Sequence, residues 1–221
     1  MKAITLLALL CIAAFAQQKG SFIDSRDGKI YKTAKIGEQV WMAENLNYEA
    51  EGSRCYNDSI SYCNKYGRFY NWAMAMGIDK EFNEKKWNGS DVKHQGVCPN
   101  GWHLPSNDDW DKLYRYADGT SDTESPYRSK TAGKYLKSKE GWNDYEGKSV
   151  KGEDKFGFSA LPGGGYSGGG FYDVGYYGSW WSSSEYSSDG AYDRYMGYFN
   201  EYAYWSYDVK SNLFSVRCVR D

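Results

Sequence analysis

The stretch CPNGWHLPSNDDWDKLYRYADG, residues 98–119, contains a cysteine followed by the best-marked helix of the chain. Ser106 stands three positions before Asp109, an S-x-x-D start that resembles a capping box with Asp in place of Glu, and Pro105 directly precedes it. Gly119 stands where such a helix should end. Between these limits apolar side chains recur at helical spacing, at Trp110, Leu113, Tyr114 and Ala117. The stretch therefore predicts an amphipathic helix with one buried face.

The pattern changes on either side of this helix. Residues 22–46 place apolar side chains between glycine turns at Gly28 and Gly37, which predicts a β-hairpin. Residues 67–77 begin and end with glycine and are rich in aromatic, Met and Ala side chains, which favours a short buried helix. A weaker helical turn is expected over residues 131–137.

The C-terminal part of the chain consists of short aromatic runs separated by glycines. Such runs are typical of strands in an antiparallel sheet. We expect these strands at residues 158–161, 180–182, 195–199, 202–205 and 214–219. The glycine cluster at residues 163–170 is expected to be a loop. Helices early and strands late predict the α+β class, and 221 residues with 41% hydrophobic side chains suit a single domain.

The charge balance disfavours nucleic acid as a partner. Lys and Arg number 27 against 29 Asp and Glu, so the formal net charge is -2 and no basic surplus is available to neutralise phosphates. With 22 Tyr and 9 Trp, the chain also has too much apolar area to remain disordered.

Residues 1–16 have the form of a signal peptide. A charged start precedes the apolar run of residues 4–13, and an A-x-A cleavage site follows at residues 14–16. The run is too short to cross a bilayer, which takes about 20 residues, and no later segment comes close. Leu10 before Cys11 does not fit the small residue that a lipidation motif places there. We expect an exported chain without a transmembrane segment.

Removal of residues 1–16 leaves four cysteines, an even number that predicts two disulfides in an oxidising compartment. Four cysteines allow three connectivities. We prefer Cys55 with Cys63, because the short polar loop between them closes easily, and Cys98 with Cys218, which ties the middle of the chain to its end. A metal site is disfavoured, since no C-x-x-C pair occurs.

Several longer motifs follow one another along the chain. They are WMAENLNY at residues 41–48, GWHLPS at residues 101–106, GFSALPGG at residues 157–164, WSSSE at residues 181–185 and SVRCVRD at residues 215–221. With them the chain resembles the Fibrobacter succinogenes major paralogous domain family over nearly all of residues 17–221, as one domain. The resemblance implies an exported bacterial protein, in the periplasm, at the cell surface or outside the cell. It also implies a C-type-lectin-like fold, shared with the formylglycine-generating enzymes, in which two early helices pack on a twisted antiparallel sheet.

Short motifs for a metal or a cofactor are weak. Trp142-Asn143-Asp144 echoes the tripeptide that holds calcium and sugar in C-type lectins, but its usual partner motif is absent. Residues 163–168 match G-x-G-x-x-G, but no helix follows them. The closely spaced cysteine pair of the formylglycine-generating enzymes has no counterpart near Cys218. We expect neither a cofactor nor a metal.

Catalytic residues are not expected either. His103 stands just before a helix start and is interpreted as structural. The carboxylate pairs Asp108 with Asp109 and Glu185 with Asp189 are explained by a helix cap and a solvated turn.

The remaining signal is the tyrosine-rich and glycine-rich stretch of residues 166–207. Strands with rings on both faces cannot bury every ring in one core, so some rings are expected at the surface. Exposed tyrosine and tryptophan rings suit sugars and protein partners equally, whereas the alternative is that they only fill the core. We expect Tyr172, Tyr176, Tyr177 and Trp205 to be exposed together, because they flank glycines or polar turns.

The sequence therefore predicts a non-enzymatic binding or surface protein that contacts a polysaccharide or a protein partner through its aromatic loops. The alternative is a divergent enzyme, either an oxidase of the formylglycine-generating type or a carbohydrate-active hydrolase.

Overall fold

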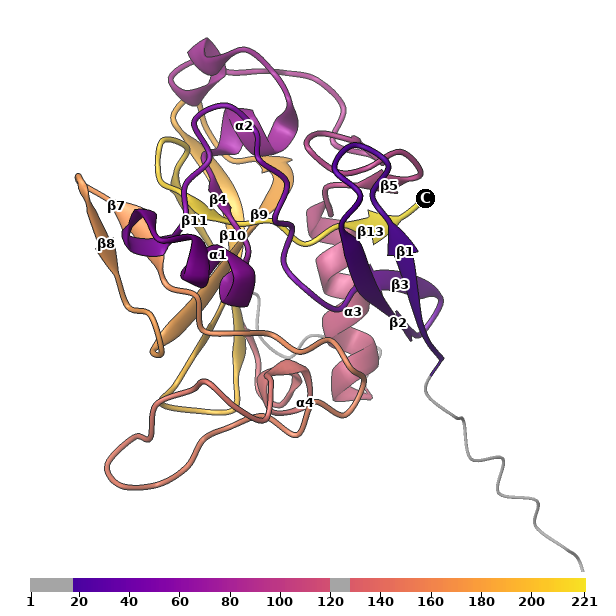
Figure 1. Ribbon diagram of the computed structural model, residues 1–221, viewed down its shortest axis with the longest axis vertical. Helices are drawn as coiled ribbons and strands as arrows, with labels where there is room; N and C mark the ends of the chain where they lie inside the picture. Colours follow the sequence, from indigo (N-terminus) through magenta and orange to yellow (C-terminus); the bar gives the residue numbers. More distant parts are fainter. Residues whose placement is uncertain (1–17, 120–127) are drawn as a thin grey trace, which may run out of the picture.

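The computed structural model describes residues 18–119 and 128–221 and combines strands with a smaller share of helix (Figure 1). The α-helices of this part are α1 (Ile60–Tyr66), α2 (Trp72–Met76), α3 (Asn107–Asp118) and α4 (Ala132–Leu136), with short 3-10 turns at Tyr56–Asp58 and Lys80–Asn83. The mixed class agrees with the α+β expectation. The expected signal peptide, residues 1–16, lies outside the described residues. Within the described part of the chain, no helix has the length and apolar character needed to cross a membrane.

The first sheet brings the early strands and the C-terminus together (Figure 1). In spatial order its strands are β1 (Lys19–Ile23), β2 (Ile30–Ile36), β3 (Gln39–Met42), β13 (Val219–Arg220) and β5 (Trp102–His103). Val219 pairs with Trp41 on one side and with His103 on the other. The expected hairpin is confirmed, and the C-terminal strand is inserted beside it.

The second sheet is larger and contains the aromatic runs. In spatial order its strands are β4 (Phe69–Tyr70), β12 (Phe214–Ser215), β9 (Tyr177–Glu185), β10 (Gly190–Gly197), β11 (Ala203–Val209) and β6 (Arg128–Ser129). Strands β9, β10 and β11 form an antiparallel meander in which Met196 lies between Gly178 and Ala203. The strands expected near residues 180–182, 195–199 and 202–205 are therefore present, with bounds shifted by a few residues.

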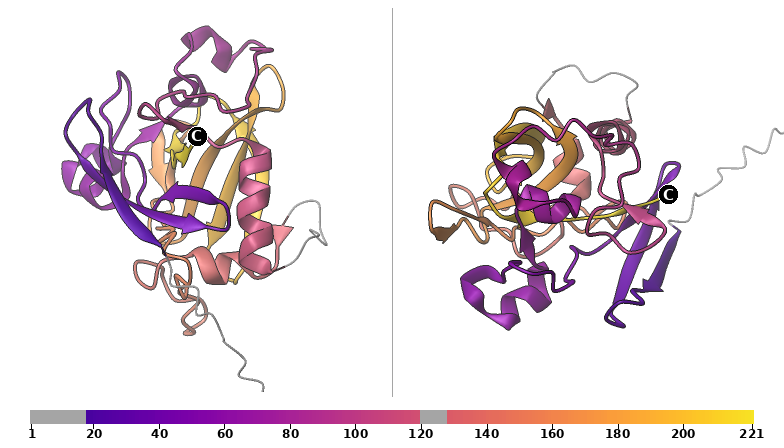
Figure 2. Two further views of the ribbon diagram at one scale, coloured as in Figure 1. Left: turned by 90° about the vertical axis from the view of Figure 1, so that its right-hand side faces the viewer. Right: turned by 90° about the horizontal axis from the view of Figure 1, so that it is seen from above.

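Two adjacent tryptophans of β9 anchor cores on opposite faces of the meander, because neighbouring strand residues point to opposite sides. Trp180 packs with Trp110 of α3, in a core that also contains α4 side chains. Trp181 packs with Phe214 at 4.6 Å between ring centroids, in the core that contains Trp72 of α2. Figure 2 shows α3 lying along one face of the sheet.

Helix α3 is the element that the sequence marked best, and its predicted start and end are confirmed. The backbone N–H of Asp109 donates to Ser106 Oγ at 3.3 Å, and the N–H of Ser106 donates to Asp109 Oδ2 at 3.0 Å. Gly119 ends the helix with φ 70°, a left-handed conformation that glycine adopts freely. The buried face consists of Trp110, Leu113, Tyr114 and Ala117, as the spacing indicated. The weaker turn expected at residues 131–137 is α4.

The helix expected over residues 67–77 is wrong in its first half. Tyr70 of β4 pairs with Phe214, and α2 begins only after Asn71, whose Oδ1 accepts from the N–H of Met74 at 2.9 Å. Pairing with a strand far along the chain overrides the local pattern. Helix α1 was also not expected, so the described residues contain four α-helices where the resemblance implied two.

The glycine cluster at residues 163–170 is more ordered than the expected loop. Strands β7 (Gly165–Ser167) and β8 (Gly170–Tyr172) form a hairpin closed by Gly168 and Gly169, with φ 56° and 88°. Two consecutive positive φ angles make the tight turn that fits the twist of a hairpin. By contrast, residues 158–161 form no named strand in the described chain and make only a bridge to Lys137.

The expected strand at residues 214–219 is divided between the two sheets. Between β12 and β13, Arg217 is fully buried, and its Nε and Nη2 donate to Asn45 Oδ1 at 3.0 and 2.6 Å. The same oxygen accepts from Trp180 Nε1 at 2.8 Å. Burial lowers the pKa of Arg217 to about 9. Residues from two of the longer motifs thus meet Trp180 in one buried polar network that joins the sheets.

Both disulfides form between the expected partners. Cys55 is bonded to Cys63 of α1, and Cys98, before β5, is bonded to Cys218, before β13. The second bond joins positions 120 residues apart. It holds the C-terminal strand in the first sheet.

Candidate functional site

Eight aromatic rings form a continuous cluster at one end of the β9–β11 meander. Each ring centroid lies between 4.6 and 6.4 Å from that of another member. None of the eight residues is fully buried. The members of this eight-ring cluster are Tyr145, Tyr176, Tyr177, Tyr195, Tyr198, Phe199, Tyr202 and Tyr204. Partly exposed rings in contact with one another form an apolar surface of the kind that binding sites use.

The strand register aligns the central rings. Tyr195 of β10 pairs with Tyr204 of β11, and their rings stack at 4.6 Å and 6°. Tyr177 lies opposite Gly197, and the ring of Phe199 occupies the space that a side chain at Gly197 would need. The absence of a side chain at this one position allows the rings to close up.

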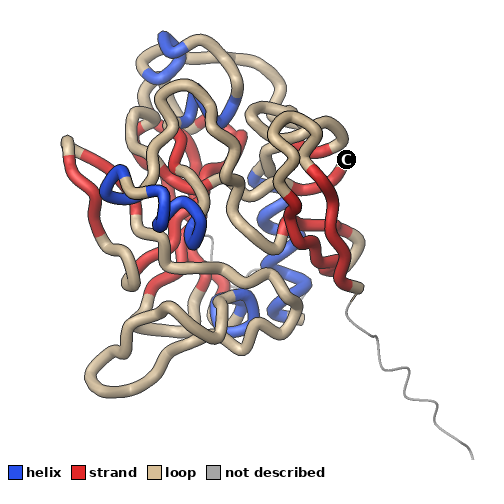
Figure 3. The backbone as a smooth tube through the Cα atoms, in the orientation of Figure 1, coloured by secondary structure: helices blue, strands red, loops and turns tan. Residues whose placement is uncertain are grey.

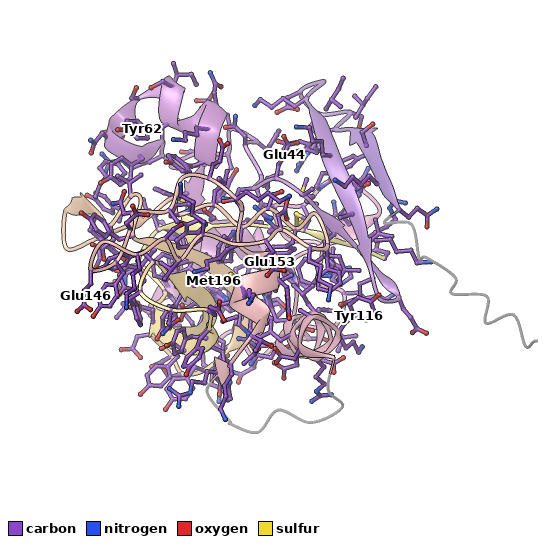
Figure 4. All side chains as sticks on the ribbon, turned by 90° about the horizontal axis from the view of Figure 1, so that it is seen from below. Glu44, Tyr62, Tyr116, Glu146, Glu153 and Met196 are labelled. Atoms are coloured by element: carbon purple, nitrogen blue, oxygen red, sulfur yellow. A yellow bond between two sulfur atoms is a disulfide. The ribbon has the colours of Figure 1, made fainter. Side chains whose placement is uncertain are left out.

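A buried lysine holds the loop that contributes Tyr145. Between α4 and β7 the chain has neither helix nor strand (Figure 3). The Lys137 ammonium donates to the carbonyls of Val150, Gly197 and Asn200 at 2.7, 3.1 and 2.7 Å, and burial lowers its pKa to about 8. This lysine ties the loop to the end of β10. Glu146, next to Tyr145, lies at the outer edge of the molecule, whereas Met196 of β10 lies inside it (Figure 4).

The face of the meander that bears Tyr195 and Tyr204 also bears acidic groups. Register and alternation place Asp193, Ser206 and Asp208 on this face, which we call the tyrosine face. Asp193 is buried, and burial, followed by the charge of Asp208, raises its pKa to about 7. Rings at one end and carboxyl groups at the other give this face both of the chemistries that sugar binding uses.

The four residues singled out by the sequence are not gathered in one patch. Tyr176, 42% exposed, and Tyr177 belong to the eight-ring cluster. Tyr172 is half-buried on β8, next to the core, and its pKa is raised by burial and then by the charges of Asp208 and Asp193.

Trp205 lies on the opposite face, which corrects the expectation that all four rings are exposed together. It follows Tyr204 directly, and consecutive strand residues alternate between faces. Its ring lies 6.0 Å from that of Tyr192 and 5.7 Å from the Arg194 guanidinium. On this other face Tyr186 and Tyr207 stack at 3.9 Å and are 47% and 55% exposed.

Two residues at or near the tyrosine face, Tyr145 and Asp193, were not expected from the sequence. Tyr145 lies outside the aromatic stretch and reaches the cluster only through the fold, with its ring 5.5 Å from that of Tyr198. Asp193 had a local signal that was not used, since it stands two residues before Tyr195 in β10, and strand alternation places both side chains on one face.

Other residues considered from the sequence have structural partners. His103 is buried, with Nδ1 2.7 Å from Asp221 Oδ1. Although burial lowers its pKa, Asp109 and Asp221 raise it above the ordinary value. The ammonium of Lys210 donates to Glu185 Oε1 at 2.6 Å. Trp142 is buried and donates through Nε1 to Ser138 Oγ at 3.1 Å. Within the described residues, no group of three or more His, Cys, Asp or Glu side chains is placed to hold a metal ion.

A cleft of about 420 Å³ lies elsewhere, between the β1–β2 hairpin and the loop after α4. Its lining includes Lys19, Lys32, Lys139, Glu44, Glu140 and Asp154. Charges of both signs alternate there, and Lys32 is 3.7 Å from Glu44. The cleft has no aromatic platform, so the tyrosine face is the stronger candidate.

Comparison with known proteins gives one finding. The family model of the Fibrobacter succinogenes major domain matches residues 34–220. No curated protein and no solved structure matches the chain. The matched range includes both disulfides, the buried network around Arg217 and the whole eight-ring cluster.

Proposed function

The chain belongs to the Fibrobacter succinogenes major domain family, and from this premise we propose that it is an exported, non-enzymatic protein that binds polysaccharide on its tyrosine face. The observation that carries the proposal is the eight-ring cluster, whose members contact one another while remaining partly exposed. Contiguous apolar surface that remains exposed marks interaction sites in soluble proteins.

Tyrosine rings suit sugars because they combine an apolar face with a polar tip. The C–H faces of a sugar ring pack on the aromatic faces, while its hydroxyls need hydrogen-bonding groups at the rim. Such groups are present, since Asn200 Nδ2 donates to the hydroxyl of Tyr204 at 2.6 Å and Asn143 lies against Gly175, next to Tyr176. Several rings in a row fit a chain of sugars better than a single one.

Two further features belong to the proposal. Export is supported by the form of residues 1–16 and by two disulfides, which form in oxidising compartments. A C-type-lectin-like fold is supported by the meeting of the early strands and the C-terminal strand in one disulfide-linked sheet.

A carbohydrate-active hydrolase is the second candidate, and one observation favours it. Asp193 and Asp208 share a face, and glycoside hydrolysis uses two carboxyl groups of which one stays protonated near neutral pH. Release of reducing sugar that is lost in Asp193→Asn would replace the binding function with this one.

The test is a pull-down of the protein on insoluble cellulose, xylan and chitin, with two matched double variants. Tyr145→Ala with Tyr176→Ala removes two outer rings of the cluster, which are 37% and 42% exposed. Binding to the retained polysaccharide should weaken by about 1 to 3 kcal/mol, or roughly 5- to 150-fold.

The control is Tyr186→Ala with Tyr207→Ala, which removes two similarly exposed rings from the opposite face. It should bind like the wild type, and both variants should keep the wild-type melting temperature. The proposal is contradicted if both double variants lose polysaccharide binding equally, or if Tyr145→Ala with Tyr176→Ala loses none.

A further inference from the structure

Asp193 carries a carboxyl group that the protein itself leaves without a partner. The residue is 4% exposed, and its buried Oδ1 makes no hydrogen bond within residues 18–119 and 128–221. Buried polar atoms are almost always paired, because an unpaired one loses its hydration and gains nothing in return. Lys137 and Lys210 show how this protein normally treats a buried charge, since each is held by several oxygens. Of the six buried side-chain atoms that lack a partner within the described residues, this oxygen is the one that belongs to a carboxyl group, and a ligand could supply its partner.

The strand register shows what surrounds this carboxyl. Asp193 lies between Trp181 of β9 and Ser206 of β11. Asp208 is the next residue of β11 on the same face, and such diagonal neighbours lie within reach of each other. Tyr172 of β8 is near enough to both carboxyl groups that their charges, after burial, contribute to the raised pKa of its hydroxyl. The carboxyl group therefore lies on the tyrosine face between the buried Trp181 and the stacked rings of Tyr195 and Tyr204.

The nearest cation is turned away from this carboxyl. Arg194 points to the opposite face, where its Nη1 donates to Asn107 Oδ1 at 3.1 Å and its Nη2 to Asp111 Oδ1 at 3.2 Å. It reaches Asp193 at the backbone carbonyl, at 3.2 Å. A negative charge on this carboxyl thus lacks a bonded counter-charge, in agreement with its raised pKa.

We propose that Asp193 and Asp208 hold the ammonium group of a glucosamine residue, with Tyr172 beside it, in a polysaccharide whose neighbouring sugars lie on the eight-ring cluster. This inference rests on the polysaccharide binding proposed above and narrows the ligand to amino sugars. An ammonium group brings three donors and a full positive charge, so it satisfies two carboxyl groups at once. A tyrosine ring attracts the same group through its π face. A neutral sugar hydroxyl offers one donor and no charge.

The proposed ligand is coupled to a proton on Asp193. An ammonium ion favours the charged carboxylate, so binding at about pH 6 should release a proton that Asp193 holds in the free protein. The charges that act on this carboxyl are those of Asp208 and Arg194, and its own charge in turn contributes to the raised pKa values of Tyr172, Tyr195 and Tyr114. The pKa values of the three tyrosines are raised by burial, so they keep their protons at this pH.

The experiment is calorimetric titration of the protein with hexamers of glucosamine, N-acetylglucosamine and glucose, at about pH 6 in two buffers of different ionisation enthalpy. The wild type should bind the glucosamine hexamer about tenfold or more tightly than either neutral hexamer, with release of a proton. Asp193→Asn keeps the shape of the side chain and should abolish both the preference and the proton release. Asp79→Asn, at an exposed aspartate outside the eight-ring cluster and the loop that contributes Tyr145, should change neither.

The outcomes separate this inference from the proposed function. Equal affinity for the three hexamers would overturn the amino-sugar inference and leave polysaccharide binding intact. Equal loss of all three hexamers in Asp193→Asn would overturn it too, because the carboxyl would then be a general acceptor. The wild type could instead bind a lysine-rich peptide as tightly as the glucosamine hexamer, with this binding lost in Asp193→Asn. That result would reassign the site to an amine carried by a protein. Failure of every saccharide would overturn the proposed function itself.

Discussion

At the scale of single residues, the protein holds three buried cations with oxygen atoms, whereas one buried carboxyl oxygen has no partner within the described residues. Lys210 is paired with Glu185, and burial, which alone would raise the pKa of Glu185, is outweighed by hydrogen bonds from Lys210 and Trp87 that lower it. Arg217 and Lys137 are held by neutral oxygens and have lowered pKa values. Asp193 differs from these groups because its buried oxygen has no such partner within the described residues. The first three stabilise the crossing of segments, whereas Asp193 is the group to which the proposal above assigns a ligand.

The titration of Asp193 predicts a pH-dependent loss of stability. The unfolded chain releases this proton near pH 3.8, whereas the folded protein holds it to about pH 7. Between these values the folded state binds more protons, so its stability falls as pH rises. Asp193→Asn removes this loss of stability. The free energy of unfolding of the variant should equal that of the wild type below pH 4 and exceed it by about 4 kcal/mol above pH 7, because each pKa unit corresponds to about 1.4 kcal/mol.

Urea unfolding at a series of pH values measures this difference. The exposed Asp144→Asn serves as the control and should follow the wild type at every pH. A constant difference between Asp193→Asn and the wild type across the series would contradict the raised pKa.

At the scale of elements, α3 is placed by its first turn. Ser106 Oγ accepts from the N–H of Asp109, and Asp109 Oδ2 accepts from Ser106 and lies 3.4 Å from His103 Nε2. His103 belongs to β5, so this turn links the helix to the first sheet, while Trp110 connects it to the second. One capped turn thus orients the helix between the two sheets.

Ser106→Ala should lower the free energy of unfolding by about 1 kcal/mol, within a range of about 0.5 to 2, because the N–H of Asp109 loses its acceptor. The measurement is chemical denaturation followed by circular dichroism. Ser149→Ala in the exposed loop is the matched control and should leave stability unchanged. Equal effects of the two substitutions would show that the cap does not stabilise α3.

At the scale of the whole molecule, the C-terminal segment decides the arrangement of the two sheets. It contributes β12 to one sheet and β13 to the other, and Cys218 and Arg217 are buried where it crosses. The disulfide from Cys98 holds this crossing on the side of β5. Figure 2 shows the consequence, with the N-terminal strands and the β7–β8 hairpin on opposite sides of the molecule.

The two disulfides should therefore contribute unequally to stability. Closing a loop of 120 residues stabilises by about 5 kcal/mol in the chain-entropy model, and closing a loop of 8 residues by about 2.5 kcal/mol. Replacing Cys98 and Cys218 together by serine should lower the melting temperature more than replacing Cys55 and Cys63 together. Peptide mapping without reduction checks the pairing first, and free thiols at all four positions would contradict it.

The sequence by itself determined the elements whose signals are local. The capped helix α3 and the glycine turns of the first hairpin follow from residue types a few positions apart, and loop length favoured the observed one of the three possible cysteine connectivities. The longer motifs identified the family, because they run through nearly all of the chain. Tyr176 and Tyr177, which the sequence singled out because they flank glycines, belong to the eight-ring cluster.

Only the tertiary structure decided what depends on partners far apart in sequence. Strand β4 replaces the first half of an expected helix because it pairs with β12, nearly 150 residues away by number. Tyr145 joins the eight-ring cluster because Lys137 ties its loop to the end of β10. Strand alternation separates Trp205 from Tyr204, and the register sets Asp193 beside Asp208 without a cation. Which face a side chain occupies, and what lies opposite it, depends on pairings that local composition does not specify.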